Sequence, residues 1–228
     1  MHVFKGFLLS YIRYGDYDAI LHCFTYREGF KSFFVKGIYS RKSKKKSYLF
    51  PLNELEISVN NPKDNNILNV SNIELLQSFY DERDIKKNTI LMFSSDFLHH
   101  ILRNENRNAD IYNEIQLFLK KLSDNNLASH ISLVFNMLRH NGLLPISIKG
   151  NFLDPETGMF TDSEKQLLFD EKTSSLWKQF ASEKNNYNLK LLREERNRFL
   201  ESLMVYYEIH FTDFRIPNSM VILQQVFE

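Results

Sequence analysis

One stretch, residues 31–46, constrains this chain more than any other. It begins as a run of aromatic and β-branched residues that suits a strand, and it ends as a cationic loop. From Lys31 to Asn53 the chain carries seven basic side chains and no acidic one. Ammonium groups cannot be buried unpaired, so this block must face either water or a polyanion. Because bases stack on rings while cations follow phosphates, the pattern suits a groove for single-stranded nucleic acid; the alternative is a solvated hairpin loop.

The charge of the chain is unevenly distributed. The formal net charge is only +1, but residues 1–74 carry 11 Lys/Arg against 7 Asp/Glu, and the rest carries 18 against 21. A basic front part and a mildly acidic rear part indicate two modules, so only the local charge favours nucleic acid. With 43% hydrophobic residues among 228, the chain can bury a substantial core.

The period of the hydrophobic residues predicts strands first and helices afterwards. Short strands are expected at residues 3–12, 19–25, 30–36, 54–59 and 67–73. Five short antiparallel strands in about 70 residues suit a small closed barrel, of which the oligonucleotide-binding (OB) fold is a common case. We therefore predict an N-terminal five-stranded OB-fold barrel over residues 1–74.

From Glu74 onward the pattern becomes helical. Apolar stripes predict helices at residues 84–103, 111–122, 127–138 and 193–211, and another around Trp177. An irregular insert at about 146–162 contains the turn DPETG, which suggests a small hairpin. The predicted class is α+β, with the barrel followed by an all-α helical domain over residues 75–228.

The sequence contains no recognisable catalytic or cofactor motif. Its seven glycines are scattered, so neither a dinucleotide fingerprint nor a phosphate-binding P-loop is present. Asp96 and His100 lie four apart on a predicted helix, but two ligands without a third favour ordinary surface residues over a metal site. Cys23, the single cysteine, is predicted to be a buried thiol. We expect a protein that is not an enzyme and has no metal and no cofactor.

The sequence also gives an expectation about cellular location. The first residues lack the basic and apolar regions of a signal peptide. No apolar run approaches the roughly 18–20 residues that a spanning helix needs. We expect a cytoplasmic protein without membrane association.

Several strings along the chain resemble the RecO family of bacterial recombination mediators. In the front part they are IRYGDYDAIL at 12–21, the segment 24–29 that begins with FT and ends with glycine, VKG at 35–37, RKSKKK at 41–46 and FPLNELEI at 50–57. In the rear part they are RHNGLLP at 139–145, DFR at 213–215 and the segment 219–227. Many members carry four zinc-binding cysteines after the Gly/Pro motif, but this chain resembles the metal-free variants, with DPETGMF at 154–160 in that place.

The resemblance implies a non-enzymatic DNA repair and recombination protein. Similar proteins bind single- and double-stranded DNA, anneal complementary strands and help recombinase displace single-strand-binding protein. They act with the ring-forming partner RecR and dock the acidic C-terminal tail of single-strand-binding protein. Two alternatives stay open: an RNA-binding OB-fold protein, or a recruitment adaptor that acts mainly through protein partners.

Candidate binding residues follow from the cationic stretch together with the resemblance. The expected DNA-binding residues are Lys31, Lys36, Tyr39, Arg41, Lys42, Lys44, Lys45 and Lys46. Phe33, Phe34 and Tyr48 are further candidates for base stacking, although about half of the rings must be core because a barrel's interior alternates with its exterior. For the acidic tail, Arg139 at a groove edge is the candidate anchor and Lys149 the next; the alternative is that Arg139 is an ordinary exposed arginine.

Overall fold

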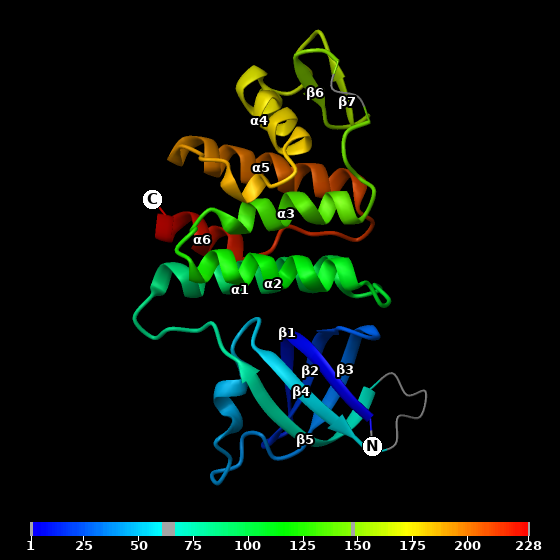
Figure 1. Cartoon of the computed structure of the whole chain (residues 1–228), viewed down its shortest axis with the longest axis vertical. Coiled ribbons are helices and arrows are strands. Elements are labelled where there is room, and N and C mark those ends of the chain that lie inside the picture. The colour runs from blue at the N-terminus through cyan, green and yellow to red at the C-terminus, as the bar shows by residue number, and fades with distance from the viewer. Residues whose placement is uncertain (1, 61–66, 147–148, 228) are drawn as a thin grey trace. The chain divides into compact units, whose positions relative to one another are not determined.

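The computed structural model describes residues 2–60, 67–146 and 149–227. Its N-terminal part contains the strands β1 (His2–Tyr14), β2 (Asp18–Thr25), β3 (Gly29–Val35), β4 (Glu54–Val59) and β5 (Ile67–Gln77). They close into a barrel in the order β1-β2-β3-β5-β4 (Figure 1). β3 runs parallel to β5, and the other neighbouring strands are antiparallel. The predicted OB-fold barrel is therefore confirmed.

Inward-facing side chains of successive strands build the core of this barrel. Leu21, Phe33 and Ile57 point inward and are completely buried, whereas Phe34, the next residue on β3, is only half-buried. Cys23 is buried as well, and burial raises the pKa of its thiol. The predicted buried cysteine is confirmed.

The described part of the chain contains six α-helices after the barrel. They are α1 (Ile85–Leu102), α2 (Ala109–Ser123), α3 (Ser129–His140), α4 (Glu171–Ser182), α5 (Arg193–His210) and α6 (Ser219–Phe227). A short hairpin of β6 (Phe152–Asp154) and β7 (Met159–Thr161) lies between α3 and α4, within the predicted insert, of which residues 147–148 lie outside the described residues. The predicted α+β class is confirmed. In the part of the chain described, no helix is both long and apolar enough to span a membrane.

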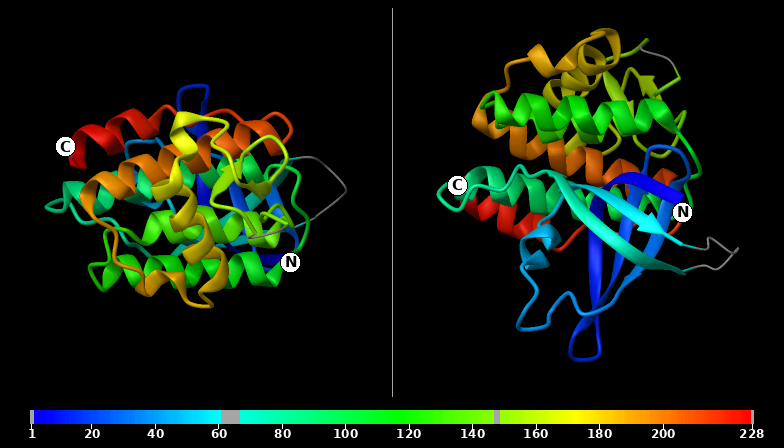
Figure 2. Two further views of the ribbon diagram at one scale, coloured as in Figure 1. Left: turned by 90° about the horizontal axis from the view of Figure 1, so that it is seen from above. Right: turned by 60° about the horizontal axis from the view of Figure 1, so that its bottom comes forward.

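The contacts divide the chain into two compact units, residues 1–113 with 217–228, and residues 114–216. In the first unit α6 lies along α1, as both views of Figure 2 show. The Ser219 hydroxyl donates to Asp96 Oδ2 on α1 at 2.8 Å, and the Lys86 ammonium lies 5.7 Å from the centre of the Phe227 ring. The C-terminal helix thus completes the unit that contains the barrel. The expected domain boundary near residue 74 stays a prediction.

Helix α1 packs against an irregularity in β1. The register of β1 with β2 shifts between Leu8 and Ser10. Ser95 of α1 donates to the Leu9 carbonyl at 2.6 Å, and the Ser10 hydroxyl is hydrogen-bonded to His99 Nδ1 at 3.0 Å. Since a bulge leaves ladder groups unpaired, Ser95 supplies the partner of the Leu9 carbonyl, and the Ser10–His99 bond adds a side-chain link between the two elements. They also fix which rows of the barrel's outer face α1 covers.

The second unit has an aromatic core of its own. The indole of Trp177 is fully buried and donates to the Ser202 hydroxyl at 3.0 Å. Phe135 and Phe199 pack around it, with ring centres 5.7 and 5.8 Å from that of Trp177. The β6–β7 hairpin is attached to this core through Lys178, whose ammonium donates to the Gly150 carbonyl. The same ammonium lies 5.0 Å from the centre of the Phe160 ring, so Lys178 holds both the start and the second strand of this segment.

Candidate nucleic-acid interface

The connection between β3 and β4, residues 36–53, is called the basic loop here. It contains a 3₁₀ helix, η1 (Lys45–Leu49). Ile38 and Leu49 are buried in the barrel core, so the loop is anchored at both sides of its cationic segment. Gly37 adopts a φ of +69°, a left-handed conformation that favours glycine, and turns the chain out of β3. The anchoring keeps the intervening cations on the surface.

The cations of the basic loop differ in what they contact. The side chains of Lys36, Arg41, Lys42, Lys44 and Lys46 are exposed, and none of the described residues forms an ion pair with them. Each unpaired ammonium or guanidinium is therefore available to a phosphate, at no cost of breaking an existing salt bridge. This cluster is the most strongly cationic surface feature that the sequence predicted.

Two of the predicted DNA-binding lysines are already engaged. Lys45 Nζ donates to the Ile73 carbonyl at 3.1 Å and to Asn72 Oδ1 at 3.4 Å, so this side chain fastens η1 to β5. Lys31 Nζ lies 3.2 Å from a carboxylate oxygen of Glu28, which offsets its charge. Both remain predictions as DNA ligands, but their contacts indicate a structural contribution.

The aromatic residues predicted to stack on bases differ in how deeply they are buried. Phe33 is fully buried in the barrel and cannot stack on a base. Tyr48 and Tyr39 are partly buried and pack against the core. The guanidinium of Arg13 lies 5.2 Å from the centre of the Tyr39 ring. Burial, together with the neighbouring Tyr11 hydroxyl, raises the pKa of Tyr39, so the phenol stays protonated at neutral pH.

Sequence reasoning did not include the tyrosines of the hairpin between β1 and β2 among the candidate binding residues. Its exposed tyrosines are Tyr11, Tyr14 and Tyr17, with 45%, 58% and 58% of their surface accessible. The hairpin is joined to the start of the basic loop, because the Tyr39 amide donates to the Tyr17 carbonyl (2.9 Å) and the Gly37 amide to Asp18 Oδ1 (2.7 Å). The signal was present in the string YIRYGDY, where three tyrosines flank a turn and an arginine.

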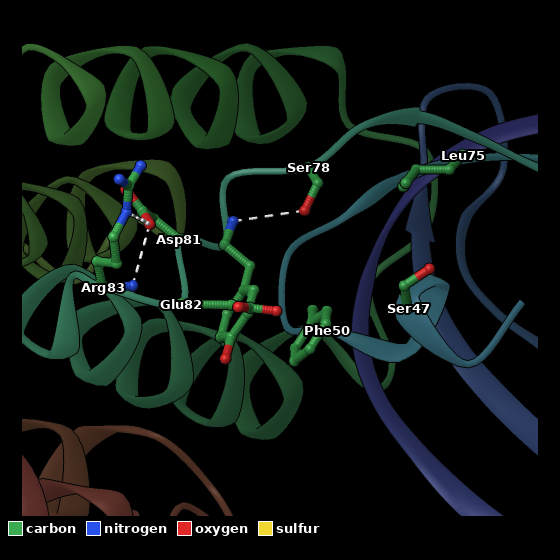
Figure 3. A pocket seen from close by; sticks show the side chains of 8 residues that line it. Ser47, Phe50, Leu75, Ser78, Asp81, Glu82 and Arg83 are labelled. Carbon is green, nitrogen blue, oxygen red and sulfur yellow. Dashed lines mark hydrogen bonds and ion pairs between the residues drawn. The ribbon is translucent and has the colours of Figure 1, made fainter.

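A hollow of about 640 Å³ borders the other end of the basic loop (Figure 3). Its lining consists of Ser47, Phe50, Leu75, Ser78, Tyr80, Asp81, Glu82 and Arg83. The rings of Phe50 and Tyr80 stack with their centres 3.7 Å apart. A hydrogen bond from the Arg83 backbone amide lowers the pKa of Asp81, so the Asp81 carboxyl is anionic at neutral pH. Arg83 Nε lies 3.6 Å from Asp81 Oδ1 in the same lining, so the hollow carries charges of both signs and does not extend the cationic surface.

The predicted partner-binding residues lie in the second unit. Arg139, near the end of α3, is half-buried, and its Nη2 donates to the Phe180 carbonyl at 3.3 Å. Lys149 is exposed just before β6. Arg139 thus has a fixed orientation, with further guanidinium donors remaining for an anionic ligand. As anchors, both residues remain predictions.

Asp96 and His100, which the sequence placed four residues apart on one helix, lie close together with partly exposed side chains. His100 Nε2 lies 3.8 Å from Asp96 Oδ1, and Asp96 also accepts the bond from Ser219 described above. Among residues 2–60, 67–146 and 149–227, no three His, Cys, Asp or Glu side chains are grouped so as to hold a metal ion.

The fold and the basic surface define a class, that of an OB-fold protein with an attached helical region. Comparison with known proteins makes this specific. The family model "Recombination protein O N terminal" matches residues 1–79. The chain is 27% identical to the DNA repair protein RecO of Flavobacterium psychrophilum, with 98% of each chain covered. It is 29% identical to that of Phocaeicola vulgatus (97% of each) and 26% to that of Porphyromonas gingivalis (99% of each). Along nearly its whole length the chain is similar to proteins of the RecO family.

Proposed function

We propose that this protein acts in DNA repair and recombination by binding single- and double-stranded DNA through its basic loop. The observation that carries the proposal is the set of exposed, unpaired cations at residues 36–46, held on a closed OB-fold barrel by the buried Ile38 and Leu49. A rigid cationic surface attracts the phosphate backbone irrespective of sequence. The names of the full-length relatives, all DNA repair protein RecO, support the biological context.

Charge neutralisation also explains how such a protein would anneal complementary strands. Two single strands repel each other through their phosphates, and bound cations reduce that repulsion. A protein that coats strands without burying the base edges leaves those edges available for pairing. The same surface would help load recombinase onto DNA that is covered by single-strand-binding protein. The proposed role is non-catalytic.

Docking of the acidic tail of single-strand-binding protein belongs to the helical part in this proposal. Arg139 offers an oriented guanidinium next to the aromatic core around Phe180, which suits a carboxylate beside an aromatic side chain. Lys149 would supply a second cation. A RecR-like partner is a further expected component of the assembly.

Direct titration tests the proposal. Fluorescence anisotropy of a labelled oligo-dT strand should rise on addition of the protein and should fall again when unlabelled DNA competes. A matched oligo-U strand as competitor separates DNA binding from the RNA-binding alternative. Absence of binding at low salt, with the protein folded, would refute the proposal and favour an adaptor that works through protein partners alone.

A further inference from the structure

The outer face of β1, β2 and β3 carries an apolar row that the barrel does not use. Strand register places Ile12 opposite Ile20, and Ile20 opposite Phe34. Ile12 is 57% exposed, while Ile20 and Phe34 are half-buried. Tyr14 adds to this row, since its ring meets that of Phe34 edge-on, at 86° with 5.6 Å between centres. We call Ile12, Tyr14, Ile20 and Phe34 the outer patch.

Helix α1 covers the neighbouring row of the same face but not the outer patch. In that row Ser10 and Ser32 lie on either side of His22. His99 of α1 is hydrogen-bonded to Ser10, and its ring centre lies 5.4 Å from that of His22. Two residues further along β1 and β3, the side chains of the outer patch are accessible. The patch is therefore a distinct surface and not a frayed part of the helix contact.

Cations border the outer patch on one side. Lys36, two residues after Phe34, is exposed at the end of β3, and the basic loop continues from it. The side chain of Arg13 lies on the opposite face of β1 from Ile12 and Tyr14, with its guanidinium 5.2 Å from the centre of the Tyr39 ring and its Nη2 donating to the Asp16 carbonyl at 3.0 Å. The carboxylate of Asp18 accepts the Gly37 amide and so helps to join the hairpin to the basic loop. The surroundings thus combine flat apolar surface with positive charge.

This combination fits one ligand class. Unpaired nucleic-acid bases present flat faces to stack on rings, and their phosphates lie within reach of neighbouring cations. Base pairs inside a duplex are already stacked and cannot reach such a surface. We propose that the outer patch, centred on the ring of Tyr14, is a stacking site for the unpaired bases of a single strand. The inference rests on the proposed DNA-binding function and adds a preference to it, since duplex DNA gains only the phosphate contacts.

The Tyr14 ring is the best position for a test because it is largely exposed, so its loss should leave the fold intact. Tyr14→Ala should weaken binding of oligo-dT about tenfold, and Tyr14→Phe, which keeps the ring, should bind as the wild type does. Tyr26→Ala is the matched control, because Tyr26 is also an exposed tyrosine (41%) but lies in the β2–β3 turn, outside the patch. Duplex DNA of the same sequence and an abasic strand with the same phosphates serve as further ligands.

The outcomes separate stacking from other roles. The inference predicts that Tyr14→Ala affects oligo-dT but neither the duplex nor the abasic strand, and that the salt dependence of oligo-dT binding stays unchanged. Equal loss on all three ligands, or wild-type affinity of Tyr14→Ala for oligo-dT, would overturn it. If loop variants lose affinity while Tyr14→Ala does not, stacking fails and the basic loop stands. If the wild-type protein binds none of the ligands, the proposed function fails first.

Discussion

The basic loop allows a quantitative test of phosphate contact. Replacing Arg41, Lys42, Lys44 and Lys46 together by Gln removes four exposed cations that have no ion-pair partner among the described residues. Each phosphate contact to a single strand contributes about −0.7 to the slope of log affinity against log salt. If all four contact phosphates, the slope should become less steep by up to about 3. Anisotropy titrations of labelled oligo-dT over a series of salt concentrations measure this slope directly.

Lys45→Gln provides the control from within the same loop. Lys45 donates to the Ile73 carbonyl and to Asn72, so its ammonium is engaged with β5. We expect this variant to keep a salt slope close to that of the wild type and to lose some stability, because the carbonyl of Ile73 loses a donor. The contrast between neighbouring lysines distinguishes specific phosphate contact from a general effect of net charge.

The stability of the quadruple variant shows whether its four cations contact phosphates or hold the loop in place. Solvated cationic side chains contribute little to folding. The free energy of unfolding of the quadruple variant should therefore lie within about 0.5 kcal/mol of that of the wild type. If the quadruple variant is folded and its salt slope equals that of the wild type, phosphate contact by the loop is refuted. A clear loss of stability would show that these side chains hold the loop in place.

Three further predictions concern the rest of the chain. Burial lowers the pKa of His99 and of His130 to about 4, so both stay neutral in the folded chain while the unfolded chain takes up protons below pH 6.5. The free energy of unfolding in urea should therefore fall as the pH is lowered from 7 to 5, and equal values at both pH would contradict the assignment. Arg139→Ala should weaken the affinity for an acidic peptide ending in an aromatic residue, measured by calorimetry; an unchanged affinity with intact fold would move the anchor to Lys149. Elemental analysis should find no stoichiometric metal, and one zinc per chain with unfolding on chelation would contradict this.

The sequence predicted most of the fold because its patterns are local. Alternation along β4 and the helical stripes of α1 to α3 each depend on residues within one element, and the observed bounds agree with the expected ones to within a few residues. The extension of β5 to Gln77, beyond the expected end at residue 73, depends on pairing with β4 and could not be read from β5 alone. The packing of α6 against α1 is likewise a long-range contact.

The candidate site was predicted less completely, for physical reasons. The concentration of charge in residues 36–46 was evident, but the engagement of Lys45 depends on the position of Ile73 in space. Similarly, alternation indicated that only some rings of β3 face outward, without giving the phase that buries Phe33 completely and leaves Phe34 half-buried. Tyr14 was overlooked because its partner Phe34 is 20 residues away in the sequence.

The rate at which complementary strands anneal tests the central claim most directly. Two complementary oligonucleotides, one carrying a fluorescence donor and the other an acceptor, report pairing as energy transfer develops. The account predicts that the wild-type protein accelerates annealing at low salt and that this acceleration declines as the salt concentration is raised. The quadruple loop variant should accelerate annealing only slightly. An annealing rate with the folded wild-type protein equal to the protein-free rate, or full acceleration by the loop variant, would contradict the account.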